Sequence, residues 1–105
     1  MDDLIEYLYK MRNKPVLYFG NRRTLADLAN FIFGFVAGRE GTNKEIDGST
    51  NWFNPANGSF HDFVVKKYQI NFSQSWSNII EFHSSSENEA FELFFKLLDE
   101  FLGKY

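Results

Sequence analysis

The strongest constraint on the fold is a helix signature near the end of the chain. Ser86 and Glu89 have the spacing of a capping box, in which two side chains satisfy backbone amides at the start of a helix. From there to Gly103, a residue type that commonly ends helices, apolar residues recur every three or four positions. They are Ala90, Phe91, Phe94, Leu97, Leu98 and Phe101. This segment predicts an amphipathic helix that presents one apolar face to a core.

Four other segments have the same helical spacing. They run from Asp2 to Arg12, from Thr24 to Gly38, from Ser59 to Tyr68 and from Ser75 to His83. The pairs Thr24–Asp27 and Ser59–Asp62, and Ser75 alone, are the expected caps. Phe31, Phe33 and Phe35 widen the apolar arc of the second segment, which predicts that it is the central helix. The whole pattern predicts a mainly α domain of about five helices.

Two connecting segments are expected to be non-helical. Residues 15–20 are apolar and begin with a proline, so we expect an extended connector. Residues 39–58 are rich in Gly and Asn and show no periodicity, which predicts a long loop. Residues 70–76 and 79–82 contain Ile, Phe and Trp, which also favour strands, so a small α+β domain is the alternative.

Composition limits the class of protein. A length of 105 residues fits one domain, and the absence of cysteine excludes disulfides and thiolate metal sites. A net charge of −3 argues against nucleic acid as the main partner. The longest uncharged apolar run, residues 31–38, is too short to span a bilayer, and the acidic start Met1-Asp2-Asp3 does not resemble a secretory signal. We expect a cytoplasmic domain; the oligomeric state stays open.

The sequence contains no recognisable catalytic arrangement. His61 and His83 are the only histidines, and the candidate ligand Glu81 lies two positions from His83, so the two side chains would diverge on a helix. Neither a nucleophile elbow nor a phosphate-binding glycine pattern is present. We therefore expect a protein that is not an enzyme and has no catalytic residues, no metal and no cofactor.

The predicted loop is the best candidate for a binding site. Trp52 and Phe53 either fold back onto the core or are exposed anchors for a protein partner. Glu40, Glu45 and Asp47 give the same segment an acidic character. An acidic surface can steer a basic partner, so these five residues form the predicted partner-binding set.

Three fragments, taken in order, carry a resemblance to a known family. They are residues 14–34, with Lys14-Pro15-Val16-Leu17-Tyr18-Phe19-Gly20 and Arg23-Thr24-Leu25; residues 60–65 with 75–80; and residues 86–101. The first is similar to the pattern R-P-x-(M/L)-Y-(L/F)-G followed by S-L-x-x-L-x-x-F-I-x-G. Together they resemble small bacterial immunity proteins, the antidotes paired with polymorphic or contact-dependent growth-inhibition toxins. We interpret every matched residue as a cap, a turn or a core position.

The resemblance implies a function and a partner. The chain is expected to bind the C-terminal domain of a cognate toxin and to block it by non-catalytic occlusion. Many such toxins are nucleases with basic clefts, so Glu45 and Asp47 are candidates to occupy phosphate positions. The alternative is a small adaptor or regulatory subunit that binds a peptide or a partner helix in an aromatic groove.

Overall fold

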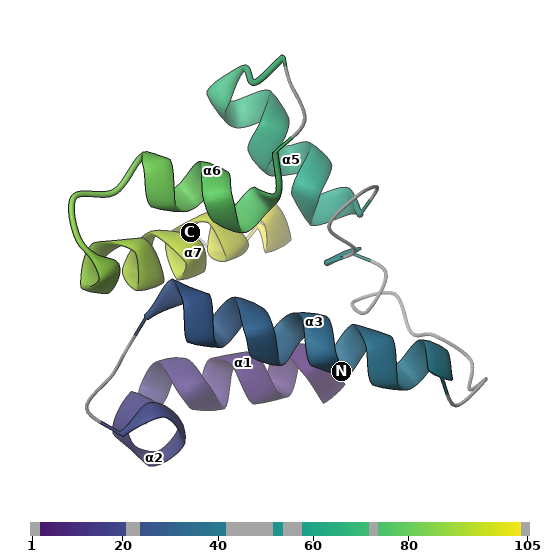
Figure 1. Ribbon diagram of the computed structural model, residues 1–105, viewed down its shortest axis with the longest axis vertical. Helices are drawn as coiled ribbons and strands as arrows, with labels where there is room; N and C mark the ends of the chain where they lie inside the picture. Colours follow the sequence, from purple (N-terminus) through teal and green to yellow (C-terminus); the bar gives the residue numbers. More distant parts are fainter. Residues whose placement is uncertain (1–2, 21–23, 42–51, 54–57, 72–73, 104–105) are drawn as a thin grey trace.

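The computed structural model describes residues 3–20, 24–41, 52–53, 58–71 and 74–103 (Figure 1). Six helices span these ranges, and the described residues contain no strand. The helices are α1 (Asp3–Asn13), α2 (Pro15–Phe19), α3 (Leu25–Gly41), α5 (Ser59–Tyr68), α6 (Trp76–Phe82) and α7 (Glu87–Leu102). The predicted mainly α fold is confirmed, and the ambiguous residues 76–82 are helical. Within the described part of the chain, no helix is long and apolar enough to cross a membrane.

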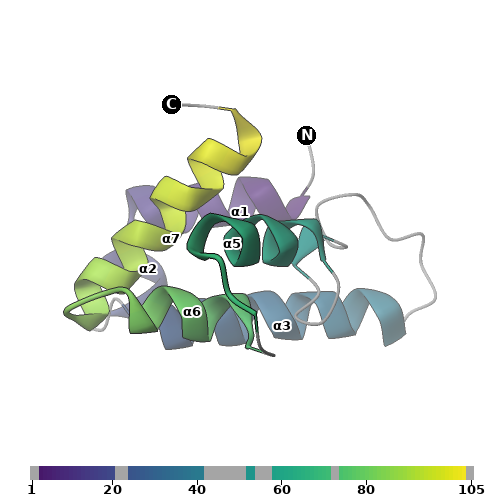
Figure 2. The same cartoon turned by 90° about the horizontal axis from the view of Figure 1, so that it is seen from above.

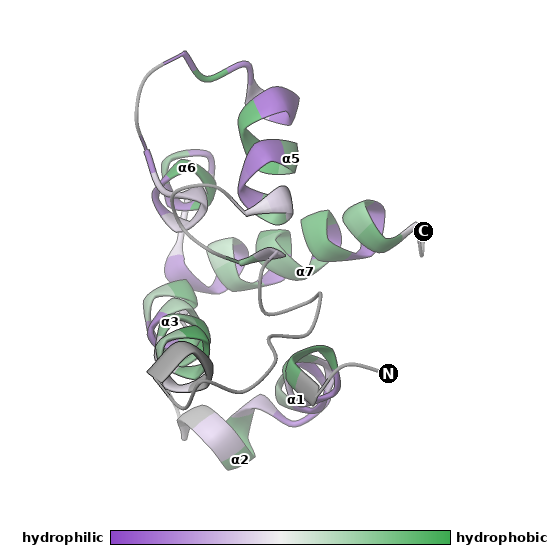
Figure 3. Ribbon diagram, turned by 90° about the vertical axis from the view of Figure 1, so that its right-hand side faces the viewer, coloured by the Kyte–Doolittle hydropathy of each residue, from purple (hydrophilic) through white to green (hydrophobic). Residues whose placement is uncertain are grey.

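Helix α7 occupies the centre of the fold. With α7 seen from the side, α1 and α3 lie on one side of it, and α5 and α6 lie on the other (Figure 3). Six α7 side chains are buried: Ala90, Phe91, Phe94, Phe95, Leu97 and Leu98. The prediction that residues 24–38 form the central helix is wrong, because Gly34, Ala37 and Gly38 lie on an exposed side of α3 and its Phe31, Phe33 and Phe35 are only partly buried.

The core is organised around four buried aromatic rings. Phe53, Phe60, Trp76 and Phe94 are all fully buried. Every pair among them is in ring contact, with centroids between 5.2 Å for Phe53–Phe60 and 6.3 Å for Phe53–Phe94. Because the four rings come from α5, α6, α7 and residue 53, their contacts hold separate parts of the chain against α7.

Local capping explains where α3, α6 and α7 begin and where α7 ends. Ser86 Oγ accepts the Glu89 amide at 3.0 Å, and Ser75 and Thr24 cap α6 and α3 in the same way. In a capping box the Glu89 carboxylate would accept a hydrogen bond from the Ser86 amide. Here it accepts hydrogen bonds from the amide and the hydroxyl of Ser85 instead, one residue earlier. Gly103 ends α7 in a left-handed conformation with φ 76°, as expected.

Three boundary predictions are wrong. Ser59 does not cap α5: it is the first helical residue, and Gly58 holds the cap position without a side chain to accept a bond. Gly38 does not end α3, which continues to Gly41 because a glycine inside a helix costs only about 1 kcal/mol. Residues 39–41 of the predicted loop 39–58 therefore belong to α3, and residues 42–51 and 54–57 of it lie outside the described residues.

Residues 15–19 form a short helix instead of the expected extended connector. Pro15 occupies the first helical position, where the N–H that proline lacks would have no partner within the helix. The Leu17 amide donates a hydrogen bond to the Lys14 carbonyl at 3.1 Å. Gly20 then ends the turn at φ 61°, and its amide bonds the Val16 carbonyl at 2.9 Å. This turn accounts for the sixth helix.

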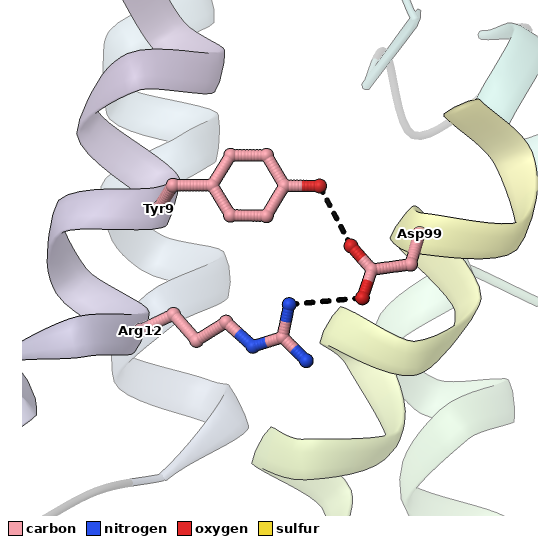
Figure 4. A network of polar contacts seen from close by, with 3 residues as sticks. All are labelled: Tyr9, Arg12 and Asp99. Carbon is pink, nitrogen blue, oxygen red and sulfur yellow. Dashed lines mark hydrogen bonds and ion pairs between the residues drawn. The ribbon is translucent and has the colours of Figure 1, made fainter. Parts of the chain in front are cut away.

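A polar network joins the first helix to the last (Figure 4). Asp99 on α7 accepts a hydrogen bond from the Tyr9 hydroxyl at 2.7 Å and pairs with Arg12 at 2.9 Å, both on α1. The Arg12 guanidinium also lies 5.4 Å from the centre of the Phe95 ring. Burial, together with the bond to the Asp99 carboxylate, raises the pKa of Tyr9 to about 12.

Candidate binding surfaces

The acidic residues of the predicted binding set fall largely beyond the described ranges. Glu45 and Asp47 lie outside the described residues, so their role stays a prediction. Glu40 belongs to α3 and not to a loop, and its side chain is not described.

The two aromatic residues of the set contribute to the core. Phe53 is 0% exposed and belongs to the four-ring cluster, so its prediction as an exposed anchor is wrong. The cause is hydrophobic: the Phe60, Trp76 and Phe94 rings form a site that an apolar ring fills better than water does. Trp52 is partly buried, with its ring edge-on to Phe101 at 5.4 Å.

Helix α2 presents apolar side chains to solvent. Val16 is 69% exposed and Leu17 is 72% exposed, and Tyr18 beside them is also exposed. The fragment that carries the family resemblance is therefore only partly structural, and its interpretation as caps, turns and core is wrong for these three residues. Sequence reasoning assumes that an apolar run is buried, and it misses this surface; the signal that was available is a proline and a glycine spaced to close one helical turn.

A second exposed apolar site lies at the end of α6. Phe82 is 85% exposed, the largest value among the exposed large hydrophobic residues that the structure describes. It borders a hollow of about 680 Å³ that is lined by Ile70, Gln74, Asn78, Ile79, Glu81, Phe82 and His83. Ile70 and Ile79 make its floor apolar, which suits an aliphatic or aromatic side chain of a partner.

His83 separates this hollow from a polar one. Its ring stacks on Tyr68 with centroids 4.1 Å apart, and its Nδ1 donates to the Ile79 carbonyl at 2.9 Å. This bond places the His83 ring at the negative, C-terminal end of α6. The polar hollow beyond it, about 560 Å³, is lined by Arg12, Tyr68, His83, Glu89, Glu92, Leu93 and Lys96. Burial raises the pKa of Tyr68.

The described part of the chain contains no candidate metal centre. Among the described residues, no group of three or more His, Cys, Asp or Glu side chains is close enough to hold an ion. His61 lies on α5 and is partly buried, whereas His83 follows α6 and is engaged with Tyr68.

Comparison with known proteins adds no family assignment. No family model matches the chain, and neither the curated proteins nor the solved structures include a significant match.

Proposed function

We propose that this chain is an immunity protein that binds the C-terminal domain of a cognate bacterial toxin in the cytoplasm and blocks it without catalysis. The ordered resemblance of residues 14–34, 60–65 with 75–80, and 86–101 to that family supports the class. A nuclease is the toxin that we expect, since many toxins of this kind are nucleases.

The observation that carries this proposal is the exposure of Val16 and Leu17. A single exposed leucine needs no explanation, but adjacent exposed apolar residues on a short, well-defined helix form a surface that a protein partner can bury. A standard interface covers about 800 Å² of each partner. The accessible surface of the chain is 6350 Å², so such an interface would use roughly an eighth of it.

Co-expression tests the proposal directly. The chain would be produced with the tagged C-terminal domain of the effector encoded by the adjacent upstream gene. We expect the two to copurify as a stoichiometric complex, and we expect the chain to restore growth of cells that express the toxin domain. Failure of both results would reject the immunity function.

The hollow beside Phe82 favours a second candidate function. A small adaptor that holds a peptide or partner helix needs an apolar groove, and Ile70, Ile79 and Phe82 line one. An operon of metabolic enzymes around the gene, and copurification with one of them that Phe82→Ser abolishes, would support the adaptor function. An adjacent effector gene, with toxin binding that Phe82→Ser leaves intact, would support immunity.

A further inference from the structure

We infer that α2 is the surface that contacts the toxin domain, and that it docks on an acidic region of the toxin around an apolar pocket. The inference rests on the proposed function and adds to it the residues used and the chemistry of the partner. Three independent features of α2 lead to it: its exposed side chains, its fixed backbone and the charge around it.

The apolar side chains of α2 contribute little to the fold. Val16 is 69% exposed and Leu17 is 72% exposed, whereas the apolar residues Leu8 and Met11 of the preceding helix α1 are buried. The chain therefore places two aliphatic side chains and the adjacent Tyr18 ring outside its own core. Burial of such side chains against a partner is the usual source of binding free energy in an interface.

The backbone of α2 is already ordered for binding. Pro15 fixes the first turn, and Gly20 closes the helix at φ 61° through its bond to the Val16 carbonyl. Packing of α2 against α1 joins this turn to the rest of the protein. A surface that is held in place before binding loses less conformational entropy on association than a flexible segment does.

The charge around α2 indicates the chemistry of the partner. Residues 7–20 contain Lys10, Arg12 and Lys14 and no acidic residue, although the whole chain has a net charge of −3. Lys10 and Lys14 are exposed, whereas Arg12 is paired with Asp99. Complementarity therefore favours an acidic patch on the toxin. If the toxin is a nuclease, this contact lies outside its basic substrate cleft.

Affinity measurements on four proteins test the inference. They are the wild-type chain, Val16→Ser/Leu17→Ser, Lys10→Glu/Lys14→Glu, and Phe82→Ser as the matched control at a separate exposed apolar position. The probe is the purified toxin domain from the adjacent gene, and melting curves establish that each variant folds. We expect the serine pair to weaken binding by about tenfold or more, and Phe82→Ser to leave it unchanged.

The variant Lys10→Glu/Lys14→Glu tests whether the partner surface is acidic, separately from the apolar contact. Wild-type association should slow as salt concentration rises, and Lys10→Glu/Lys14→Glu should associate more slowly and lose that salt dependence. If charge reversal changes neither property, the acidic character of the partner is wrong. If Val16→Ser/Leu17→Ser and Lys10→Glu/Lys14→Glu both bind the toxin as wild type does, α2 is not the interface and the proposed function stands.

Two further outcomes distinguish the remaining possibilities. A wild-type chain that does not bind the toxin domain rejects the proposed function and this inference together. Wild-type binding to phosphatidylglycerol vesicles that the α2 variants lose, while their toxin affinity is retained, would assign the surface to an anionic membrane and overturn the inference.

Discussion

At the scale of single residues, Phe94 is a central side chain of the aromatic core. Its ring contacts Phe53, Phe60, Trp76 and Phe95, and its side chain is fully buried. Phe94→Ala removes the ring from a site that surrounding rings cannot refill, and we expect a loss of ~3–5 kcal/mol in the free energy of unfolding. Urea denaturation monitored by circular dichroism would measure it.

Phe82→Ala provides the control for that experiment. It removes the same ring at an exposed position, so the free energy of unfolding should change by no more than about 0.5 kcal/mol. Equal effects of the two substitutions would show that the assigned inner face of α7 is wrong.

Whether a side chain is buried could be predicted from the sequence only in segments with helical periodicity. Phe60 and Phe94 lie at helical spacing, and both are buried as that spacing indicates. Phe53 follows an aperiodic segment, so nothing in its neighbours shows that it enters the core. Val16 and Leu17 mislead in the opposite direction, because hydropathy alone cannot distinguish a residue that packs internally from one that a partner buries.

At the scale of helices, the capping serines allow a matched prediction. Ser86 accepts the Glu89 amide at the start of α7, so Ser86→Ala should lower the free energy of unfolding by about 1 kcal/mol. Ser59 lies inside the first turn of α5 and has no capping role, so Ser59→Ala should have almost no effect. Thermal melting of the two variants would measure both. A larger loss for Ser59→Ala would contradict the observed start of α5.

Helix identity was easier to predict than helix boundaries. The caps at Thr24, Ser75 and Ser86 are correct, because each has a side-chain oxygen followed three residues later by the amide that it accepts. Pro15–Phe19 was not predictable by periodicity, since five residues are too few to define a helical face. The exposed apolar surface of α2 was missed for that reason.

At the scale of the whole molecule, helices from opposite ends of the sequence meet at α7. The aromatic cluster attaches α5 and α6 to one side of α7, and Asp99 attaches α1 to the other through Tyr9 and Arg12. Tyr9 lies 90 positions and Arg12 lies 87 positions before Asp99 in the sequence, so local spacing could not predict these two contacts. They nevertheless determine how the N-terminal part, with α2, is held on the rest of the protein (Figure 2).

The contact between Tyr9 and Asp99 should make the stability of the fold sensitive to alkaline pH. Its pKa is raised from 10.0 to about 12, so the folded state holds the hydroxyl proton that donates to Asp99 more tightly than the unfolded chain does. The stabilisation is complete below pH 10 and is lost as pH rises from 10 to 12. Tyr9→Phe has no such proton, so the stability advantage of wild type over Tyr9→Phe should shrink across that range. Urea denaturation of both proteins at pH 8, 10 and 11 would measure it. Tyr9→Phe keeps every other titratable group of the chain, so an advantage that stays constant with pH would mean that the Tyr9–Asp99 bond does not hold α1 against α7.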